Sequence, residues 1–137
     1  MSYRKEVIIN SIKCVELNLE EFRFEYVHAD KLLICGDSVF VIEETSSPEV
    51  KDVKKITNTV EKLRSGELWL TLSLVLNYER AQATKNMRYY GVLHKNRRGH
   101  PMVSKVLKSR ATRLEVPMRV VNCNDELRSW IRELIHR

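Results

Sequence analysis

The sequence predicts an α/β fold in which helices flank a central mixed β-sheet. Three features indicate this class: a short β-hairpin near residues 32–42, helical periodicity in several later segments, and apolar runs of strand length between those segments. No linker, internal repeat or low-complexity segment divides the chain. The 137 residues are therefore expected to form a single domain with one packed core.

The N-terminal part is expected to contain a helix followed by a strand. Apolar residues within positions 3–16 recur at helical spacing, which favours an amphipathic helix. From Phe22 to Tyr26 aromatic and charged residues alternate. This alternation is typical of a strand, and it predicts a lead-in to the hairpin.

Residues 30–47 form the stretch around which the rest of the chain is expected to be arranged. Two short apolar runs, 32–35 and 39–42, flank the turn-forming triplet Gly36-Asp37-Ser38 and predict a β-hairpin. Asp30 precedes the first strand and Glu43 follows the second. Because antiparallel neighbours bring the start of one strand beside the end of the other, these two carboxylates form a candidate metal-binding pair.

A helix is predicted directly after the hairpin. Ser46 and Ser47 precede Pro48, which suits a first helical turn, and Gly66 is a good stop, so the helix should end near residue 64. Its apolar residues form one stripe. The lysines at 51, 54 and 55 fall far from that stripe and are expected to face solvent.

The C-terminal half predicts alternating helices and strands. Leucine alternates perfectly through residues 67–78, which favours a strand, with a buried helix as the open alternative. The other expected elements are a short helix at 81–87, a buried strand at 89–94, a basic loop at 95–100, a helix from Pro101, a strand at 117–123 and a last helix from Asn124 or Asp125.

The cysteines and the apolar runs bear on where the protein acts. Cys14, Cys35 and Cys123 are odd in number and far apart, without zinc or redox spacing, so we expect buried reduced thiols and a cytoplasmic location. No apolar run reaches the ~18 residues of a membrane span, and the first residues lack a secretory signal. A membrane partner is therefore not expected.

Positive charge is concentrated in one segment. The net charge is +6, yet residues 80–119 hold eleven Lys or Arg against one acid, so the rest of the chain carries −4. This segregation predicts a polyanion partner, DNA or RNA, although a solvated basic surface without a partner is the alternative. The predicted nucleic-acid contacts are Lys95, Arg97, Arg98, His100, Lys105 and Lys108.

Several other chemistries are not indicated. The chain has no G-x-G-x-x-G, no P-loop and no glycine-flanked Ser or Cys nucleophile, which argues against nucleotide hydrolysis and acyl transfer. Its four histidines lack the spacing of zinc ligands.

The acid-flanked hairpin, followed by helix, strand, helix and strand, resembles the PD-(D/E)xK nuclease superfamily. This superfamily includes many restriction enzymes, archaeal Holliday-junction resolvases and exonuclease domains. The similarity covers about residues 3–123. It implies a restriction-endonuclease-like fold in which Asp30 and Glu43 hold Mg²⁺ or Mn²⁺. It also implies a lysine, two residues after the Glu, that orients or activates the attacking water.

Two positions depart from the family pattern. Ala29 replaces the Pro before Asp30, and Thr45 occupies the lysine position, where it supplies no charge. Some members of such families take the lysine from a following helix, which makes Lys51, Lys54 and Lys55 candidates that the helical wheel disfavours. If Glu44 were the ligand instead, the lysine position would still be without a cation.

The sequence therefore favours a nucleic-acid-binding protein with a nuclease-like fold and weak or absent catalysis. One alternative is a Mg²⁺- or Mn²⁺-dependent nuclease that uses Asp30 and Glu43. Another is a non-enzymatic subunit that docks a protein or a second copy through residues 68–76 or the last helix. In the plainest interpretation, Asp30 and Glu43 only cap the strand ends.

Overall fold

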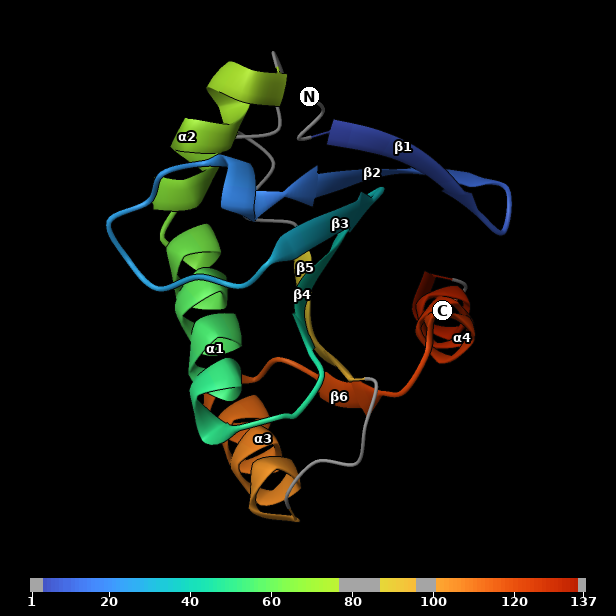
Figure 1. Ribbon diagram of the computed structural model, residues 1–137. Helices are drawn as coiled ribbons and strands as arrows, with labels where there is room; N and C mark the ends of the chain where they lie inside the picture. The colour runs from blue at the N-terminus through green and yellow to red at the C-terminus, as the bar shows by residue number, and fades with distance from the viewer. Residues whose placement is uncertain (1–3, 77–86, 96–100, 136–137) are drawn as a thin grey trace.

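A six-stranded mixed sheet forms the centre of the molecule, which confirms the predicted α/β class (Figure 1). The computed structural model describes residues 4–76, 87–95 and 101–135. The strands lie in the order of the sequence: β1 (Arg4–Ile9), β2 (Ile12–Asn18), β3 (Lys31–Cys35), β4 (Ser38–Thr45), β5 (Arg88–Lys95) and β6 (Met118–Val121). The helices described are the 3₁₀ turn η1 (Leu19–Glu21), α1 (Val50–Arg64), α2 (Glu67–Leu76), α3 (Pro101–Leu114) and α4 (Asn124–Ile135).

Strand β4 joins two kinds of pairing. Strands β1 to β4 form an antiparallel meander, whereas β5 and β6 continue the sheet in parallel with β4. The parallel neighbours need long connections, and α1 with α2 lies between β4 and β5 while α3 lies between β5 and β6. The carboxyl ends of β4, β5 and β6 consequently meet at one edge of the sheet.

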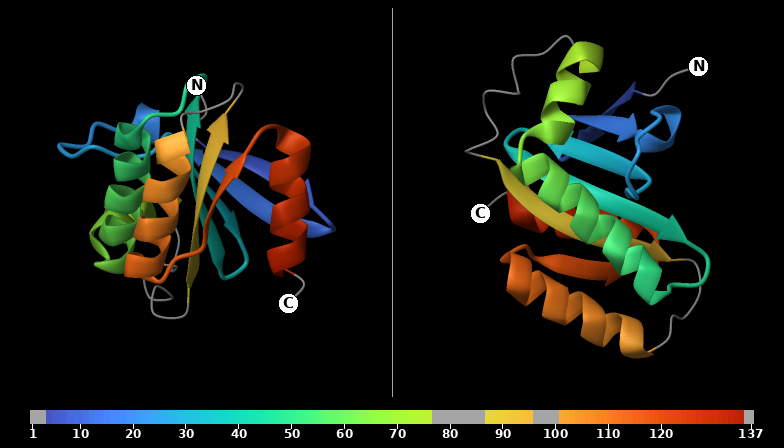
Figure 2. Two further views of the ribbon diagram at one scale, coloured as in Figure 1. Left: turned by 90° about the horizontal axis from the view of Figure 1, so that it is seen from below. Right: turned by 90° about the vertical axis from the view of Figure 1, so that its left-hand side faces the viewer.

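Helices cover both faces of the sheet (Figure 2). Helices α1, α2 and α3 lie on one face, where β4 contributes Val39 and Val41 to a core shared with Ile56 of α1. Helix α4 lies on the other face, where Phe40 of β4 and Trp130 of α4 share a second core. The alternation along β4 thus divides its side chains between two helical layers.

The predicted N-terminal helix is wrong, because residues 4–18 form β1 and β2 instead. Asn10 and Ser11 join the two strands, both with positive φ (50° and 67°). Two consecutive residues of this kind make a tight hairpin turn whose twist matches that of the strands. The helical spacing of the apolar residues arose from two strands whose alternation changes phase across this turn.

The predicted strand from Phe22 to Tyr26 is also wrong. These residues lie in an irregular segment between η1 and β3. The rings of Phe22, Phe24 and Tyr26 stack on one another, with centroids 5.5 Å and 5.1 Å apart. Phe22 and Phe24 also pack against the core under α1. The aromatic residues alternate because this irregular segment packs one side against the core, although it pairs with no strand.

The favoured strand at residues 67–78 is corrected to a helix, α2, which spans Glu67–Leu76. Leu68, Trp69 and Leu72 are buried, while 68% of Leu70 is exposed. This spacing fits one face of a helix, and leucine's high helix propensity outweighs the alternation.

The other predicted elements divide into those confirmed and those outside the described residues. The hairpin, the helix after it, the strand at 89–94, the helix from Pro101, the short strand after Pro117 and the last helix are all confirmed. Of the helix predicted at 81–87, Met87 belongs to no helix or strand and the other residues lie outside the described part.

The expectation of three buried reduced thiols is wrong. Cys14 of β2 and Cys35 of β3 are opposite each other in the antiparallel register and form a disulfide. Cys123 is free and exposed. Residues far apart in sequence become neighbours through strand pairing, which spacing along the chain does not reveal. Within the described segments, no helix has both the length and the apolar character that a membrane crossing requires.

Candidate functional site

A cavity of about 650 Å³ opens at the carboxyl end of β4, between the start of β3 and the first half of α1. Half of its lining residues are acids, and two lysines of α1 lie on its wall. Crevices at the carboxyl ends of strands in mixed sheets are common ligand sites, because the connecting loops leave space there. The lining residues used below are Glu20, Asp30, Glu43, Asp52 and Lys55.

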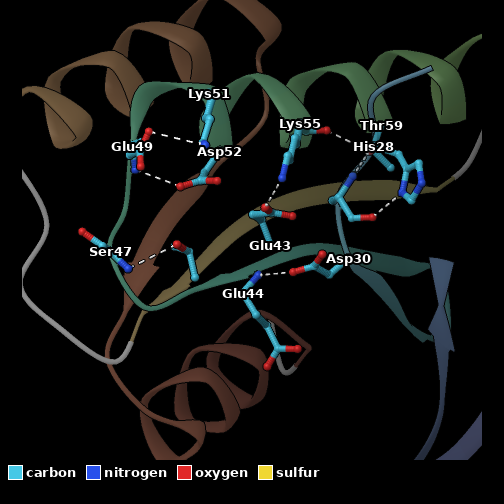
Figure 3. Close-up of polar contacts among 12 residues, drawn as sticks. His28, Asp30, Glu43, Glu44, Ser47, Glu49, Lys51, Asp52, Lys55 and Thr59 are labelled. Carbon is cyan, nitrogen blue, oxygen red and sulfur yellow. Dashed lines mark hydrogen bonds and ion pairs between the residues drawn. The ribbon is translucent and has the colours of Figure 1, made fainter. Parts of the chain in front are cut away.

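The hairpin register brings Asp30 and Glu43 together, as expected from the sequence. Lys31 pairs with Ile42, so the next residues along each strand, Asp30 and Glu43, face each other across the strand ends. The backbone N–H of Glu44 donates to Asp30 Oδ2 at 2.8 Å and fixes that carboxylate (Figure 3). Asp30 is thus held at the mouth of the site by the strand that carries its partner.

Glu43 is buried, with 2% of its surface exposed. Its Oε2 lies 3.2 Å from Nζ of Lys55, and its Oε1 is buried without a hydrogen-bond partner. Burial, together with the nearby charge of Asp30, raises the pKa of Glu43 to about 7, although Lys55 opposes this shift. A buried carboxylate oxygen without a partner is costly, and a cationic ligand would satisfy it.

Lys55 of α1 is the lysine that contacts Glu43. The prediction that Lys51, Lys54 and Lys55 face solvent is wrong for Lys55, whose side chain is only 34% exposed and points at Glu43 (Figure 3). Burial disfavours its charge, but the hydrogen bond and charge of Glu43 outweigh this and raise the Lys55 pKa. Lys51 and Lys54 are exposed, as predicted.

The apolar stripe alone underestimated the buried face of α1. Asp52 and Thr59, which lie three residues before and four residues after Lys55, are also buried. Asp52 Oδ2 accepts the Glu49 N–H at 2.8 Å and so belongs to the helix start. The helical wheel considered apolar residues alone, so it missed that the polar residues Asp52 and Thr59 belong to the buried face of α1.

Glu20 is a second site residue that the sequence did not reveal. A hydrogen bond shared with Asp30, and repulsion between the two carboxyls, raise the Glu20 pKa. Its position follows from the 3₁₀ turn η1, which Asn18 caps by accepting the Glu20 N–H at 3.0 Å. In the sequence, Asn18 could have indicated the start of a capped turn, because asparagine is a preferred N-cap residue.

No protein-family model, curated protein or solved structure matches this chain.

Thr45 has a local structural contact. Its Oγ1 accepts the N–H of Ser47 at 3.3 Å, which shapes the turn from β4 into α1 (Figure 3). Thr45 lines the same cavity, so the position of the family lysine is inside the site.

Glu44 points to the opposite face of the sheet. Its carboxylate pairs with Lys31 at 3.2 Å and with His94 at 3.5 Å, and Lys31 also pairs with Glu16 at 3.1 Å. These contacts tie β2, β3, β4 and β5 together, and Glu16, Lys31 and Glu44 also line the cavity. Glu43, and not Glu44, therefore faces α1 and Lys55.

The acids suit a small hard cation. Among the described residues, no group of three or more His, Cys, Asp or Glu side chains lies close enough to hold a metal ion. The available carboxylates are Asp30 and Glu43, whose Oε1 is without a partner. Mg²⁺ is commonly bound by one or two carboxylates and keeps several waters, so two carboxylates fit it.

The predicted nucleic-acid contacts lie on a neighbouring surface. Lys105 and Lys108 are exposed on α3, which packs beside α1 on the same face of the sheet (Figure 2). Lys95, partly buried, ends β5 at the sheet edge that carries the cavity. Arg97, Arg98 and His100 lie outside the described residues.

Proposed function

We propose that this protein is a nuclease that requires a divalent metal, of the PD-(D/E)xK type, and that it binds DNA or RNA through its basic half. One observation supports this above all others. Lys55 lies 3.2 Å from one oxygen of Glu43, while the other oxygen is buried without a partner beside Asp30. The arrangement combines two carboxylates and a lysine although the lysine position of the motif holds Thr45.

The residues divide the chemistry among them. Asp30 and Glu43 would hold Mg²⁺ or Mn²⁺, which supplies Lewis-acid polarisation of the phosphodiester when bound. Lys55 holds the attacking water and stabilises negative charge as the water loses its proton. The water oxygen bonds to phosphorus and gives one proton to bulk solvent, the bond to one sugar oxygen breaks, and that oxygen takes up a proton from solvent. The products are a phosphomonoester end and a hydroxyl end.

The basic surface on α3 would bind the phosphate backbone of the substrate. Lys105, Lys108, Arg110 and Arg113 are all exposed there. Phosphate contacts from such residues position a nucleic acid without reading its sequence. Because the cavity itself is rich in acids, binding energy from outside the cavity is needed to bring a phosphodiester into it. The cytoplasmic location expected from three reduced thiols loses that support, because Cys14 and Cys35 form a disulfide.

Binding without cleavage is the second candidate. It is favoured by the pairing of Lys55 with Glu43, since an ion pair of this kind also stabilises a fold that binds no metal. In that case the basic surface would still hold nucleic acid, and α2 with its exposed Leu70 would be available for a protein partner.

Cleavage assays separate these candidates. Purified protein is incubated with Mg²⁺ or Mn²⁺ and with branched, single-stranded or duplex substrates. Glu43→Gln and Lys55→Met should each lower the rate by at least about 100-fold. Lys54→Met, which changes an exposed lysine next to Lys55, should leave the rate within about threefold. Equal cleavage by all four proteins, or cleavage by none, would exclude the nuclease and leave binding alone.

A further inference from the structure

Thr59 connects the two elements that carry the site. Its hydroxyl donates to the backbone carbonyl of Lys55 at 2.8 Å and accepts the backbone N–H of Ala29 at 2.7 Å (Figure 3). Ala29 directly precedes Asp30. One hydroxyl therefore links the turn of α1 that carries Lys55 to the segment that carries Asp30.

This link is buried. Thr59 and Ala29 both have 0% exposure, so water cannot replace either hydrogen bond. The segment before β3 is irregular and has no strand partner that would fix the backbone of Ala29. A second contact from α1, in which Asn58 Nδ2 donates to Val27 O at 3.2 Å, holds the same segment further out.

The contacts at Asp30 show why the link matters. The Asp30 carboxylate is fixed to β4 by the Glu44 N–H, and the Asp30 carbonyl accepts the Leu19 N–H at 2.8 Å, while residues 27–29 carry the contacts of this segment with α1. Glu43, in turn, is paired with Lys55 on α1. Thr59 is the buried point at which the segment leading into Asp30 meets the turn of α1 that carries Lys55.

We infer that Thr59 is a positioning residue, which holds Asp30 and Lys55 at the spacing that a divalent cation and a phosphodiester need. This inference rests on the proposed function. Residues that orient metal ligands without touching the metal commonly change metal affinity 10- to 100-fold when they are replaced. Thr59→Val keeps the shape of the side chain but removes both hydrogen bonds.

The chain offers a closely matched control. Thr57 is also buried in α1 and its hydroxyl donates to the carbonyl of Lys54 at 3.0 Å, which is the same kind of helix contact. No described hydrogen bond joins the Thr57 hydroxyl to the segment before β3. Thr57→Val therefore removes a helix contact alone, whereas Thr59→Val removes a helix contact and the link to Ala29.

The experiment measures Mn²⁺ binding by electron paramagnetic resonance at a temperature where every variant is folded. Thr59→Val should weaken Mn²⁺ binding by about 10-fold or more. Thr57→Val should stay within about twofold, and Thr59→Ser should restore most of the loss. In cleavage assays, Thr59→Val should raise the Mn²⁺ concentration needed for half-maximal rate without changing KM for the nucleic acid.

The outcomes distinguish the inference from the proposed function. Mn²⁺ binding that depends on Glu43 but is equal in the two valine variants would overturn the role of Thr59 and leave the nuclease intact. Absence of binding to the unaltered protein would overturn both. If Thr59→Val does not fold, amide exchange in the unaltered protein decides: Mn²⁺ should slow exchange of the Ala29 N–H, and an unchanged rate would contradict the link.

Discussion

The Glu43 side chain combines burial, a lysine partner and an oxygen without a partner. Its pKa of about 7 means that its folded and unfolded states differ in protonation between pH 4.5, the ordinary value, and about pH 7. In that range the folded state binds a proton that the unfolded state has lost. The free energy of unfolding therefore falls as the pH rises, by up to about 3 kcal/mol from this one group.

Glu43→Gln should remove this dependence. Without metal, the variant should be more stable than the unaltered protein at pH 8, where Glu43 is charged, and close to it at pH 5, where Glu43 is protonated. Lys55 remains about one third exposed, so it stays solvated after losing its partner. Thermal unfolding in EDTA at the two pH values measures the difference, which we expect to be several degrees at pH 8.

Mg²⁺ provides the complementary test for the same residue. It should raise the melting temperature of the unaltered protein more at pH 8 than at pH 6, because metal binding requires the deprotonated carboxylate. The Glu43→Gln variant should not respond. A stability difference between the two proteins that does not change with pH would contradict the shifted pKa.

At the level of single residues, the sequence predicted the positions that the β3–β4 hairpin fixes. Asp30 and Glu43 could be paired because a short turn fixes the register of the two strands. Lys55 could not be placed, since its direction depends on how α1 lies over the sheet. Glu20 depends on a single 3₁₀ turn, and its contact with Asp30 also depends on three-dimensional packing.

Helix α2 shows how propensity and pattern can disagree within one element. A strand at this position would place Leu70 and Leu72 on the same face, whereas the helix separates them by about 200°. Leu72 is fully buried and Leu70 is exposed. The two leucines therefore report directly on which structure forms.

Leu72→Ala should destabilise the fold by about 2–5 kcal/mol, because it leaves a cavity beneath α2. Leu70→Ala should change stability by less than about 0.5 kcal/mol. Urea unfolding of both variants measures these costs. Similar losses for the two substitutions would be the result expected of a strand, and would count against the helix.

At the level of elements, the predictions failed where the local pattern of apolar residues was compatible with more than one structure. The N-terminal hairpin imitated helical spacing because the alternation changes phase at Asn10 and Ser11. Alternation between Phe22 and Tyr26 came from stacked rings on α1's side of the molecule. The β3–β4 hairpin, with its turn chemistry, was predicted well. Helix α1 was predicted as an element, but its N-cap is Glu49, paired with Asp52, and not Ser46 or Ser47, so Pro48 lies before the helix.

Across the whole molecule, charge is separated into a basic surface on α3 and an acidic cavity beside it. The basic surface should determine the affinity for nucleic acid, and the cavity should determine whether the bound nucleic acid is cleaved. Replacing Lys105 and Lys108 together with Ala should therefore weaken binding to any sequence by a similar factor. It should also reduce the slope of log affinity against log salt by about 2 for duplex DNA.

Fluorescence anisotropy at several salt concentrations measures that slope. Lys13→Ala serves as the control, because Lys13 is exposed on β2 and its ion-pair partner is Glu6 on β1, outside α3 and the cavity. An unchanged slope in the double variant would remove α3 from the nucleic-acid surface.

The mixed sheet was predictable as a class because hairpins give antiparallel pairs and intervening helices give parallel ones. The pairing of Cys14 with Cys35 was not, since it follows from strands that meet only in the folded sheet.

The change of strand direction at β4 also orders how the site is assembled during folding. The meander from β1 to β4 joins segments that are close in sequence, so it closes small loops at low entropic cost. Strand β5 can pair with β4 only after the chain from Thr45 to Arg88 has been brought back. Asp30, Glu43 and Lys55 are all close in sequence and therefore meet through local contacts, whereas β5 completes the sheet beside them through a slower, longer-range pairing.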